Sequence, residues 1–490
     1  MPTYEELLEE NAELRRQVAE QERRIAEQKG RIVDQEGRIA DQERQNATLK
    51  RRIADLEKLI EEVRRRGKRQ AAPFSKGAPS ADPKPPGRKA GDQYGQQATR
   101  PRPERADETI EVPCPLYCEH CQGKVVLQGK ADQYQVDLPE IRPWTTEFIL
   151  HHGKCSKCGR EVVGRDARQS SQSFRVGNVQ LGPGVLALAA WLNKVAGLSY
   201  GKIAALLKQL AGLSVSRSAL CRALLRMSKR LEPLYDELKA KIQSSPVVYP
   251  DETGWREGGH SVWMWIFTNR RETVYSIEPG RGYDQASEVL GEGFAGVLVA
   301  DGWASYQKFE EATHQTCLAH LLRRCEEMLE KATRGAVRFP RRVKEILQSA
   351  LEVRDQRDEG KISGEALEKA RQELELQMDR CLSGRFTNPD NRRLAQHLIR
   401  HQEQLFLFLE RPDVEATNWP AEQGIRPAVI NRKTSGGNRT AEGSQAQAVL
   451  MSVLRTLQQH QLGALEILPQ LLRSPQPLKL DAILASSQPP

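Results

Sequence analysis

Apolar residues recur at heptad spacing along nearly all of residues 1–66, with charged and amide side chains between them. This pattern predicts a coiled-coil helix, because every apolar residue then faces one seam. β-Branched residues dominate one seam position and Leu the other, which favours a parallel dimer, and Asn11 and Asn46 would fix its register. We therefore expect a homodimer or higher oligomer, with a single solvated helix as the alternative. The seam residues are Leu7, Leu14, Leu49, Leu56 and Val63 at one position and Val18, Ile25, Ile32, Ile39, Ile53 and Ile60 at the other.

After the heptads the apolar pattern stops, and residues 67–110 are rich in Pro, Gly and charge. Such a segment buries too little apolar surface to offset its chain entropy, so we expect a disordered linker. Residues 64–105 contain 12 Lys or Arg against 3 acids, an excess equal to the net charge of +9 of the whole 490-residue chain. A basic linker of this kind can follow a phosphate backbone, although a solvated linker without a partner fits the same composition.

The cysteines of residues 111–165 predict a zinc-binding unit. Two Cys-x-x-Cys pairs are separated by 33 residues that contain short strand-like stretches. Each pair offers two thiolates, and two pairs make a tetrahedral zinc site, which would be structural in a unit this small. The alternative is a set of unrelated free thiols. We expect one Zn²⁺ held by Cys118, Cys121, Cys155 and Cys158.

Cysteine usage and hydropathy also indicate a compartment. The chain has nine cysteines, an odd number that fits a reduced, cytoplasmic protein with a metal site better than a disulfide scaffold. Its first residues, MPTYEELLEENAEL, are polar and acidic, so we expect no signal peptide. The apolar run VLALAAWL is too short to cross a bilayer, so we expect no membrane as a partner.

Residues 175–243 have helical periodicity and the outline of a helix-turn-helix. Ser199 would cap a first helix whose apolar face includes Ile203, and after a Gly-containing turn Ser216 would cap a second helix. Arginines on the second helix favour a DNA-binding region over an ordinary helical bundle, which is the alternative. These arginines are Arg217, Arg222 and Arg226.

Strand patterns and two acids indicate the chemistry of the C-terminal half. The stretch YPDETGW at 249–255 follows an apolar strand pattern, so we expect Asp251 at or just past a strand end. Two more strand patterns, a helix pattern at 283–290 and a buried strand ending at Asp301 come next. This order matches the ribonuclease-H-like fold, in which the first and fourth strands are neighbours. Two carboxylates brought together there would repel unless Mg²⁺ neutralised them, so we favour a metal ligand over a turn residue at Asp251.

Taken together, these motifs resemble the insertion sequence 66 family of transposases, bacterial enzymes of the D-D-E type. The resemblance rests on the heptads, the two Cys pairs and the motifs PFSKG, PGRKAG, DETGW, VADGWASYQKF, CLAHLLRR and ATNWPAEQGIRPAVINRKTSGGNRT. It implies a multidomain α/β protein with a ribonuclease-H-like catalytic domain at 244–460, a helical insertion at about 310–415 and a C-terminal tail at 461–490. It also implies a cytoplasmic, nucleoid-associated enzyme that acts on double-stranded DNA, with small helper proteins of the same element.

The resemblance further implies a third acid, a Glu on a helix beyond the insertion. The motif TNWPAEQGIRP assigns this role to Glu422, and Glu442 in RTAEGSQ is the competing candidate. The family more often has two adjacent Asn before this Glu and an Arg after it, whereas this chain has Trp419 and Gln423. These departures bear on the efficiency of the site rather than on the assignment. Pro420 suits the first turn of a helix that would present Glu422.

The implied reaction is two-metal phosphoryl transfer. Two Mg²⁺ ions about 3.5–4 Å apart, held by Asp251, Asp301 and Glu422, would activate the attacking water or 3′-hydroxyl and stabilise the leaving oxygen. Cys317 and His320 in CLAHLLRR share one helical face, either as a buried structural pair or as a contact to metal or DNA ends. Phosphate contacts are expected from Arg323, Arg324, Lys433 and Arg439.

Two other functions are compatible with the same residues. A ribonuclease-H-like nuclease or resolvase without strand transfer explains the acids but gives the heptad arm and the insertion no role. A non-catalytic DNA-binding regulator on a decayed transposase is the other alternative, because the residues around Glu422 differ from the family pattern.

Overall fold

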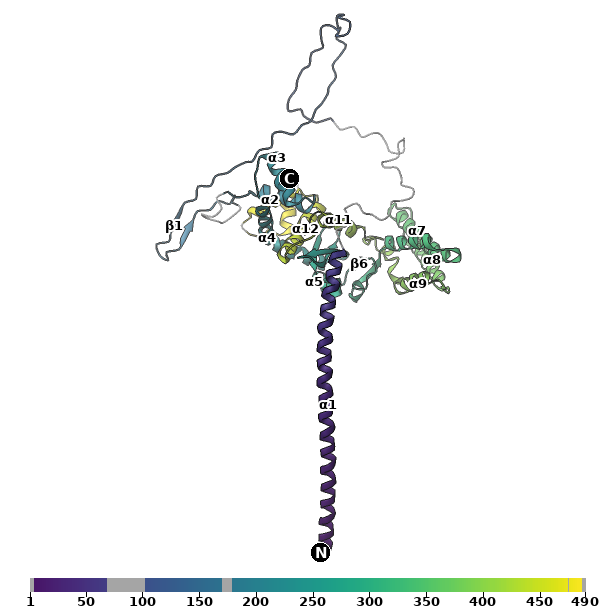
Figure 1. Ribbon diagram of the computed structural model, residues 1–490. Coiled ribbons are helices and arrows are strands. Elements are labelled where there is room, and N and C mark those ends of the chain that lie inside the picture. The colour runs from purple at the N-terminus through teal and green to yellow at the C-terminus, as the bar shows by residue number, and fades with distance from the viewer. Residues whose placement is uncertain (1–3, 68–101, 170–178, 475, 487–490) are drawn as a thin grey trace. The chain divides into compact units, whose positions relative to one another are not determined.

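The computed structural model describes residues 4–67, 102–169, 179–474 and 476–486 (Figure 1). The chain divides into two compact units, Met1–Ala106 and Asp107–Pro490. Most of the predicted basic linker, residues 68–101, lies outside the described residues.

The heptad segment is one continuous helix, α1 (Tyr4–Gly67), of 64 residues. Its described seam side chains, among them Leu14, Val18 and Ile25, are exposed in the single chain. A stripe of exposed apolar side chains is what one strand of a coiled coil presents before it pairs. The helix is therefore as expected, and its pairing with a second copy stays a prediction.

Residues 102–169, which contain the four paired cysteines, have little regular structure. Strands β1 (His152–Lys154) and β2 (Glu161–Val163) pair antiparallel on either side of the second Cys pair. Tyr117 and Lys124 form an isolated antiparallel bridge on either side of the first pair. Each Cys pair thus occupies the turn of a small hairpin, which is the local geometry expected of a zinc knuckle.

Three helices follow, and both predicted helix caps are present. Ser199 accepts a hydrogen bond from the backbone N–H of Lys202 (3.3 Å), and Ser216 accepts one from that of Ala219 (3.1 Å). These hydroxyl oxygens satisfy backbone donors that have no partner inside the helix. The helices are α2 (Pro183–Lys194), α3 (Tyr200–Ala211) and α4 (Arg217–Gln243).

The turn between α3 and α4 depends on Gly212, which ends α3 in the left-handed conformation with φ 64°. Ile203 and Leu207 of α3 pack against Leu220 of α4 in a small core that also includes residues of α2. The two capped helices are therefore held as one packed unit, as the helix-turn-helix outline predicts.

A five-stranded mixed sheet forms the centre of the second unit. Its strand order is β5-β4-β3-β6-β7. The first three strands in sequence pair antiparallel, whereas β6 pairs parallel to β3 and β7 parallel to β6. The first and fourth strands of this sheet are therefore neighbours, as expected. The strands are β3 (Val247–Glu257), β4 (His260–Thr268), β5 (Thr273–Glu278), β6 (Val297–Ala300) and β7 (Thr313–Thr316).

Alternate residues of the strands enter two different hydrophobic cores, one on each face of the sheet. Val248 lies in the first core and its neighbour Val247 in the second, as the two-residue period of a strand requires. The first core contains residues of α2, α4, α5 (Tyr283–Leu290), α12 (Ala441–Gln459) and α13 (Ala464–Arg473). The second contains residues of α6 (Leu318–Lys331), α7 (Arg338–Asp358), α8 (Gly364–Leu382), α9 (Pro389–Arg400), α10 (Leu407–Glu410) and α11 (Trp419–Ser435).

Two boundaries differ from those expected. The helical insertion begins after residue 317, because residues 313–316 of the predicted insertion form β7 of the sheet. The predicted C-terminal tail contains α13 and α14 (Leu480–Ser486), whose apolar residues Leu468 and Ile483 are buried in the first core. Among the described helices, none combines the length and the apolar composition that crossing a membrane requires.

Candidate active site

The two predicted strand acids lie beside each other because β3 and β6 are neighbours. The parallel pairing of these strands ends at Val248 and Leu298, so Asp251 and Asp301 both lie just beyond it. Asp251 was expected at or just past the end of its strand, but it lies inside β3. β3 continues to Glu257 because it pairs antiparallel with β4, where Asp251 faces Ile266. The acid is thus fixed by strand pairing rather than by a turn.

The surroundings of Asp251 are unfavourable for a negative charge. Burial, followed by the charges of Glu252, Asp301 and Glu422, raises its pKa to about 7, although the backbone N–H of Glu252 donates to Oδ1 at 2.9 Å. Desolvation and like charges both favour the protonated acid. All three predicted acids therefore share one electrostatic neighbourhood, although they come from β3, the end of β6 and α11.

Asp301 follows the last residue of β6 and is held by the next turn. The backbone N–H of Trp303 donates to Asp301 Oδ1 at 3.0 Å. Gly302 has φ +83°, and a Cβ at this position would lie 3.0 Å from Cε1 of His397. Only Gly fits there without displacing the ring, so the DGW motif allows α9 of the insertion to pack against the acid site.

Glu422 lies in the first turn of α11, as expected, and faces α6. Its carboxylate oxygen is 3.8 Å from His320 Nε2 and 3.9 Å from Arg323 Nη2. The rival candidate, Glu442, lies in the first turn of α12, where it pairs with Lys229 of α4 at 2.7 Å. These contacts favour Glu422 as the partner of the two aspartates.

Buried hydrogen bonds hold the start of α11 against β3 and α6. The side-chain amide of Asn418 donates to the carbonyl of Pro250 at 2.7 Å, and its backbone N–H donates to Cys317 Sγ at 3.1 Å. Burial raises the pKa of the Cys317 thiol, so the sulfur is a neutral acceptor here. Cys317 therefore has a structural contact, whereas His320 is directed at Glu422.

Sequence reasoning missed the role of Glu252, whose side chain is only 2% exposed. Arg281 pairs with one carboxylate oxygen and the hydroxyl of Tyr306 donates to the other. Arg281 itself lies between two tryptophan rings, 4.9 Å from the centroid of Trp263 and 3.9 Å from that of Trp303. Both oxygens of Glu252 are thus engaged by the fold. The adjacent acids in DETGW were a signal, but these partners lie far along the chain.

The donors of the acid cluster suit a hard cation. Carboxylate oxygens are the ligands that Mg²⁺ prefers, and the pKa of Asp251, raised by burial and then by neighbouring negative charges, shows a carboxylate that a cation would stabilise. In the conformation of the described residues, no three His, Cys, Asp or Glu side chains are grouped closely enough to hold a metal ion. The residue types fit Mg²⁺, and its coordination geometry stays a prediction.

The cysteine pairs have the local features of metal ligands. The backbone N–H groups of His120 and Cys121 lower the pKa of the Cys118 thiol, and those of Cys158 and Lys157 lower that of Cys155. A lowered pKa favours the thiolate, the form that binds zinc. Within the described residues, the four cysteines are not brought together into one group that could hold a metal ion. The zinc site at Cys118, Cys121, Cys155 and Cys158 therefore remains a prediction.

The predicted DNA contacts lie on three different elements. Those of α4 are exposed and two of them are four residues apart, so they share a helix face. Those of α6 lie next to the acid cluster, and the remaining two lie near the end of α11 and in the loop that follows it. In this order the residues are Arg217, Arg222 and Arg226, then Arg323 and Arg324, then Lys433 and Arg439.

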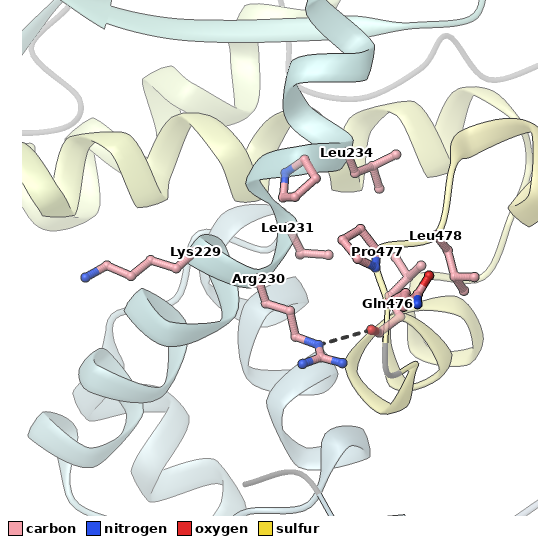
Figure 2. A pocket seen from close by; sticks show the side chains of 9 residues that line it. Lys229, Arg230, Leu231, Leu234, Gln476, Pro477 and Leu478 are labelled. Carbon is pink, nitrogen blue, oxygen red and sulfur yellow. Dashed lines mark hydrogen bonds between the residues drawn. The ribbon is translucent and has the colours of Figure 1, made fainter. Parts of the chain in front are cut away.

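A cavity of about 230 Å³ lies elsewhere, between α4 and the C-terminal segment (Figure 2). Arg230 Nε donates to the carbonyl of Leu471 at 3.3 Å, and Leu231, Leu234 and Leu478 line the walls. None of the three acids lines this cavity. It is a gap beside a packed helix rather than part of the acid site.

Comparison with known proteins identifies the family of the chain. Residues 178–446, more than half of the chain, match the family described as Transposase IS66 family, and this span contains Asp251, Asp301 and Glu422. Uncharacterized protein y4qI of Sinorhizobium fredii (strain NBRC 101917 / NGR234) is 24% identical over 429 residues, which cover 79% of this chain and 76% of that protein. Uncharacterized protein y4jD of the same strain is 24% identical over 278 residues, or 50% of this chain and 53% of that protein. The chain belongs to the IS66 family of transposases.

Proposed function

We propose that this transposase is a D-D-E enzyme that binds transposon ends and cleaves and joins DNA strands in a Mg²⁺-dependent reaction. The observation that carries this proposal is that the β3–β6 pairing places Asp251 and Asp301 at matching positions of neighbouring strands, while the hydrogen bond from Asn418 to Pro250 holds the start of α11, with Glu422, against β3. The strand order and the parallel β3–β6 pair support a ribonuclease-H-like catalytic domain.

Asp251, Asp301 and Glu422 would hold the metal ions. Bound Mg²⁺ would supply charge neutralisation and a water of lowered pKa for phosphoryl transfer. Because Arg281 and Tyr306 engage both oxygens of Glu252, Asp251 is the acid of β3 that is left to bind a cation.

Other side chains of the chain would orient the third acid and the DNA. His320 and Arg323 contact Glu422 from α6 and would fix its carboxylate on the side of the two aspartates. Arg323 is more than half exposed, so it can also meet a phosphate of the substrate. Asn418 and Cys317 would hold α11 in the position that presents Glu422.

The remaining parts of the chain would bring DNA to this site. The capped helices α3 and α4, with Arg217, Arg222 and Arg226, and the zinc unit would bind the terminal repeats. α1 would join two copies so that both ends are held together. Helper proteins of the same element would act with this assembly.

The test is a strand-transfer assay with labelled transposon ends and Mg²⁺. Joined product supports the transposase. Cleavage without joining would indicate the nuclease or resolvase alternative, and binding without cleavage would indicate a non-catalytic regulator. Asp301→Asn in the same assay should bind the ends and leave them uncut.

A further inference from the structure

Charge is unevenly distributed within the helical insertion. Residues 331–345 and 383–400 together carry ten Lys or Arg and two acids, a net charge of +8. Residues 346–382, which lie between them in sequence, carry six Lys or Arg and nine acids, a net charge of −3. A solvated helical subdomain has no need of such a separation, so the basic part calls for an explanation of its own.

The two basic stretches lie next to each other in the fold. The side-chain amide of Asn391 in α9 donates to the carbonyl of Ala336 at 3.0 Å. The rings of Phe339 in α7 and Phe386 are 4.4 Å apart. The start of α7 and the start of α9 are therefore in contact, and their arginines belong to one basic region.

This region is connected to the acid site by two helices. α6 starts next to Glu422, which Arg323 approaches to 3.9 Å, and leads to the 3-10 turn Arg334–Val337. α9 starts near that turn and ends beside Gly302, against which His397 packs. The 14 residues of α6 and the 12 of α9 give helix lengths of about 21 and 18 Å. The basic region thus extends about 20 Å from the acids.

Four arginines at the far end are exposed and form neither an ion pair nor a side-chain hydrogen bond among the described residues, whereas Arg392 donates to the carbonyl of Phe386. Arg342 and Arg393 have carboxylate partners, Glu345 and Asp390, and their charges are partly satisfied. The unpaired arginines are Arg334, Arg338, Arg341 and Arg385. Arginines without carboxylate partners are available to bind phosphate groups.

We propose that this basic face, made by residues 331–345 and 383–400, binds the phosphate backbone of the duplex that flanks the scissile bond. The proposal rests on the proposed function, because it takes the acid cluster as the place of cleavage. At 3.4 Å per base pair, about 20 Å corresponds to roughly 6 base pairs beyond the cleaved phosphate. Contacts of this kind position DNA without reading its sequence.

The test is the salt dependence of DNA binding by the full chain, measured without Mg²⁺ on a duplex that extends past the transposon end. Arg338→Gln with Arg341→Gln should weaken binding about tenfold and lower the slope of log affinity against log salt by about two. Arg338→Lys with Arg341→Lys keeps the charge and should keep the slope. The matched control, Lys369→Gln with Arg380→Gln, removes two exposed charges from the acidic part and should bind as the wild type does.

A footprint on the same duplex gives the second readout. The Gln pair should lose protection over about 6 base pairs on one side of the scissile bond. An unchanged slope and footprint, in variants with the wild-type melting temperature, would overturn the proposal and leave an acidic protein or solvent as the occupant of this face. A chain that binds as proposed but does not cleave would refute the enzyme and not the face, because binding is measured without Mg²⁺.

Discussion

The acid cluster and the double-cysteine unit are both predicted metal sites, yet they are prepared in opposite ways. The three acids are positioned by strand pairing and by the two cores on the faces of the sheet. The four cysteines lie in two hairpin turns, and large apolar side chains around them are exposed, with Trp144 at 94%. The fold alone positions the acid cluster, whereas the cysteine unit would need a bound metal ion to hold its two turns together.

This difference has an energetic meaning. A core that positions carboxylates without a cation is destabilised by their burial and, to a smaller extent, by their mutual repulsion, and both effects raise the pKa of Asp251. A unit without a core of its own avoids that cost, but its folding free energy must come from metal binding. Loss of metal should therefore leave the acid site folded and the cysteine unit unfolded.

The largest expected effect separates the two candidates for the third acid. Glu422→Gln should reduce strand cleavage by at least about 10³-fold, since even loss of an outer partner of a metal ligand typically costs 10- to 100-fold. Glu442→Gln is the matched control, because Glu442 already pairs with Lys229. This variant should cleave DNA at a near-normal rate. A gel assay on labelled ends measures both. Loss of cleavage in Glu442→Gln alone would transfer the role to that residue.

The next effect tests the cysteine unit. Cys155→Ser should release zinc and unfold residues 111–165, while the sheet and its helices stay folded. Metal analysis and limited proteolysis measure the two outcomes. Cys114→Ser, an exposed cysteine outside the pairs, is the control and should keep its zinc. Full zinc occupancy in Cys155→Ser would disprove the site as drawn.

A smaller effect tests the repulsion at the acid site. The pKa of Asp251 is about 7 in the folded chain and about 4 in an unfolded one, so the metal-free protein should lose stability as pH rises from about 4 to about 7. Asp251→Asn removes this loss and should be more stable than the wild type at pH 8 by roughly 4 kcal/mol, with little difference at pH 4. Metal-free thermal melts at both pH values measure it. Equal stability of the wild type and Asp251→Asn at pH 8 would mean that the charge of Asp251 does not destabilise the folded protein.

The smallest effect on chemistry concerns α1. Deletion of residues 1–66 should leave both metal sites unchanged and abolish self-association through the heptads. Light scattering measures the mass, and an unchanged oligomer would place the contact between copies elsewhere in the chain.

Sequence patterns predicted the elements whose formation depends on residues close together in the chain. The capping hydroxyls of Ser199 and Ser216, the heptad helix and the apolar strands before the two aspartates all depend on nearby residues. β7 was missed because THQT is polar. Gln315 is buried there, and its side-chain amide donates to the carbonyl of Leu405 at 3.0 Å, 90 residues away in sequence.

The site was predictable only in part for the same reason. Its three acids stand in recognisable motifs, but the partners of Glu252, Arg281 and Tyr306, are 29 and 54 residues away and have no local signature. Helix α13 inside the predicted C-terminal tail was not expected, although Leu468 and Leu472 are four residues apart, a helical spacing that indicates a buried face.

The most direct test of the catalytic assignment is strand cleavage by Asp251→Asn on labelled transposon ends with Mg²⁺. Asn keeps the size of the side chain and can still accept the backbone hydrogen bond from Glu252, so only the charge is lost. End binding should stay close to that of the wild type, and cleavage should fall by at least about 10³-fold. Near-normal cleavage by folded, DNA-bound Asp251→Asn would contradict the catalytic assignment of this acid.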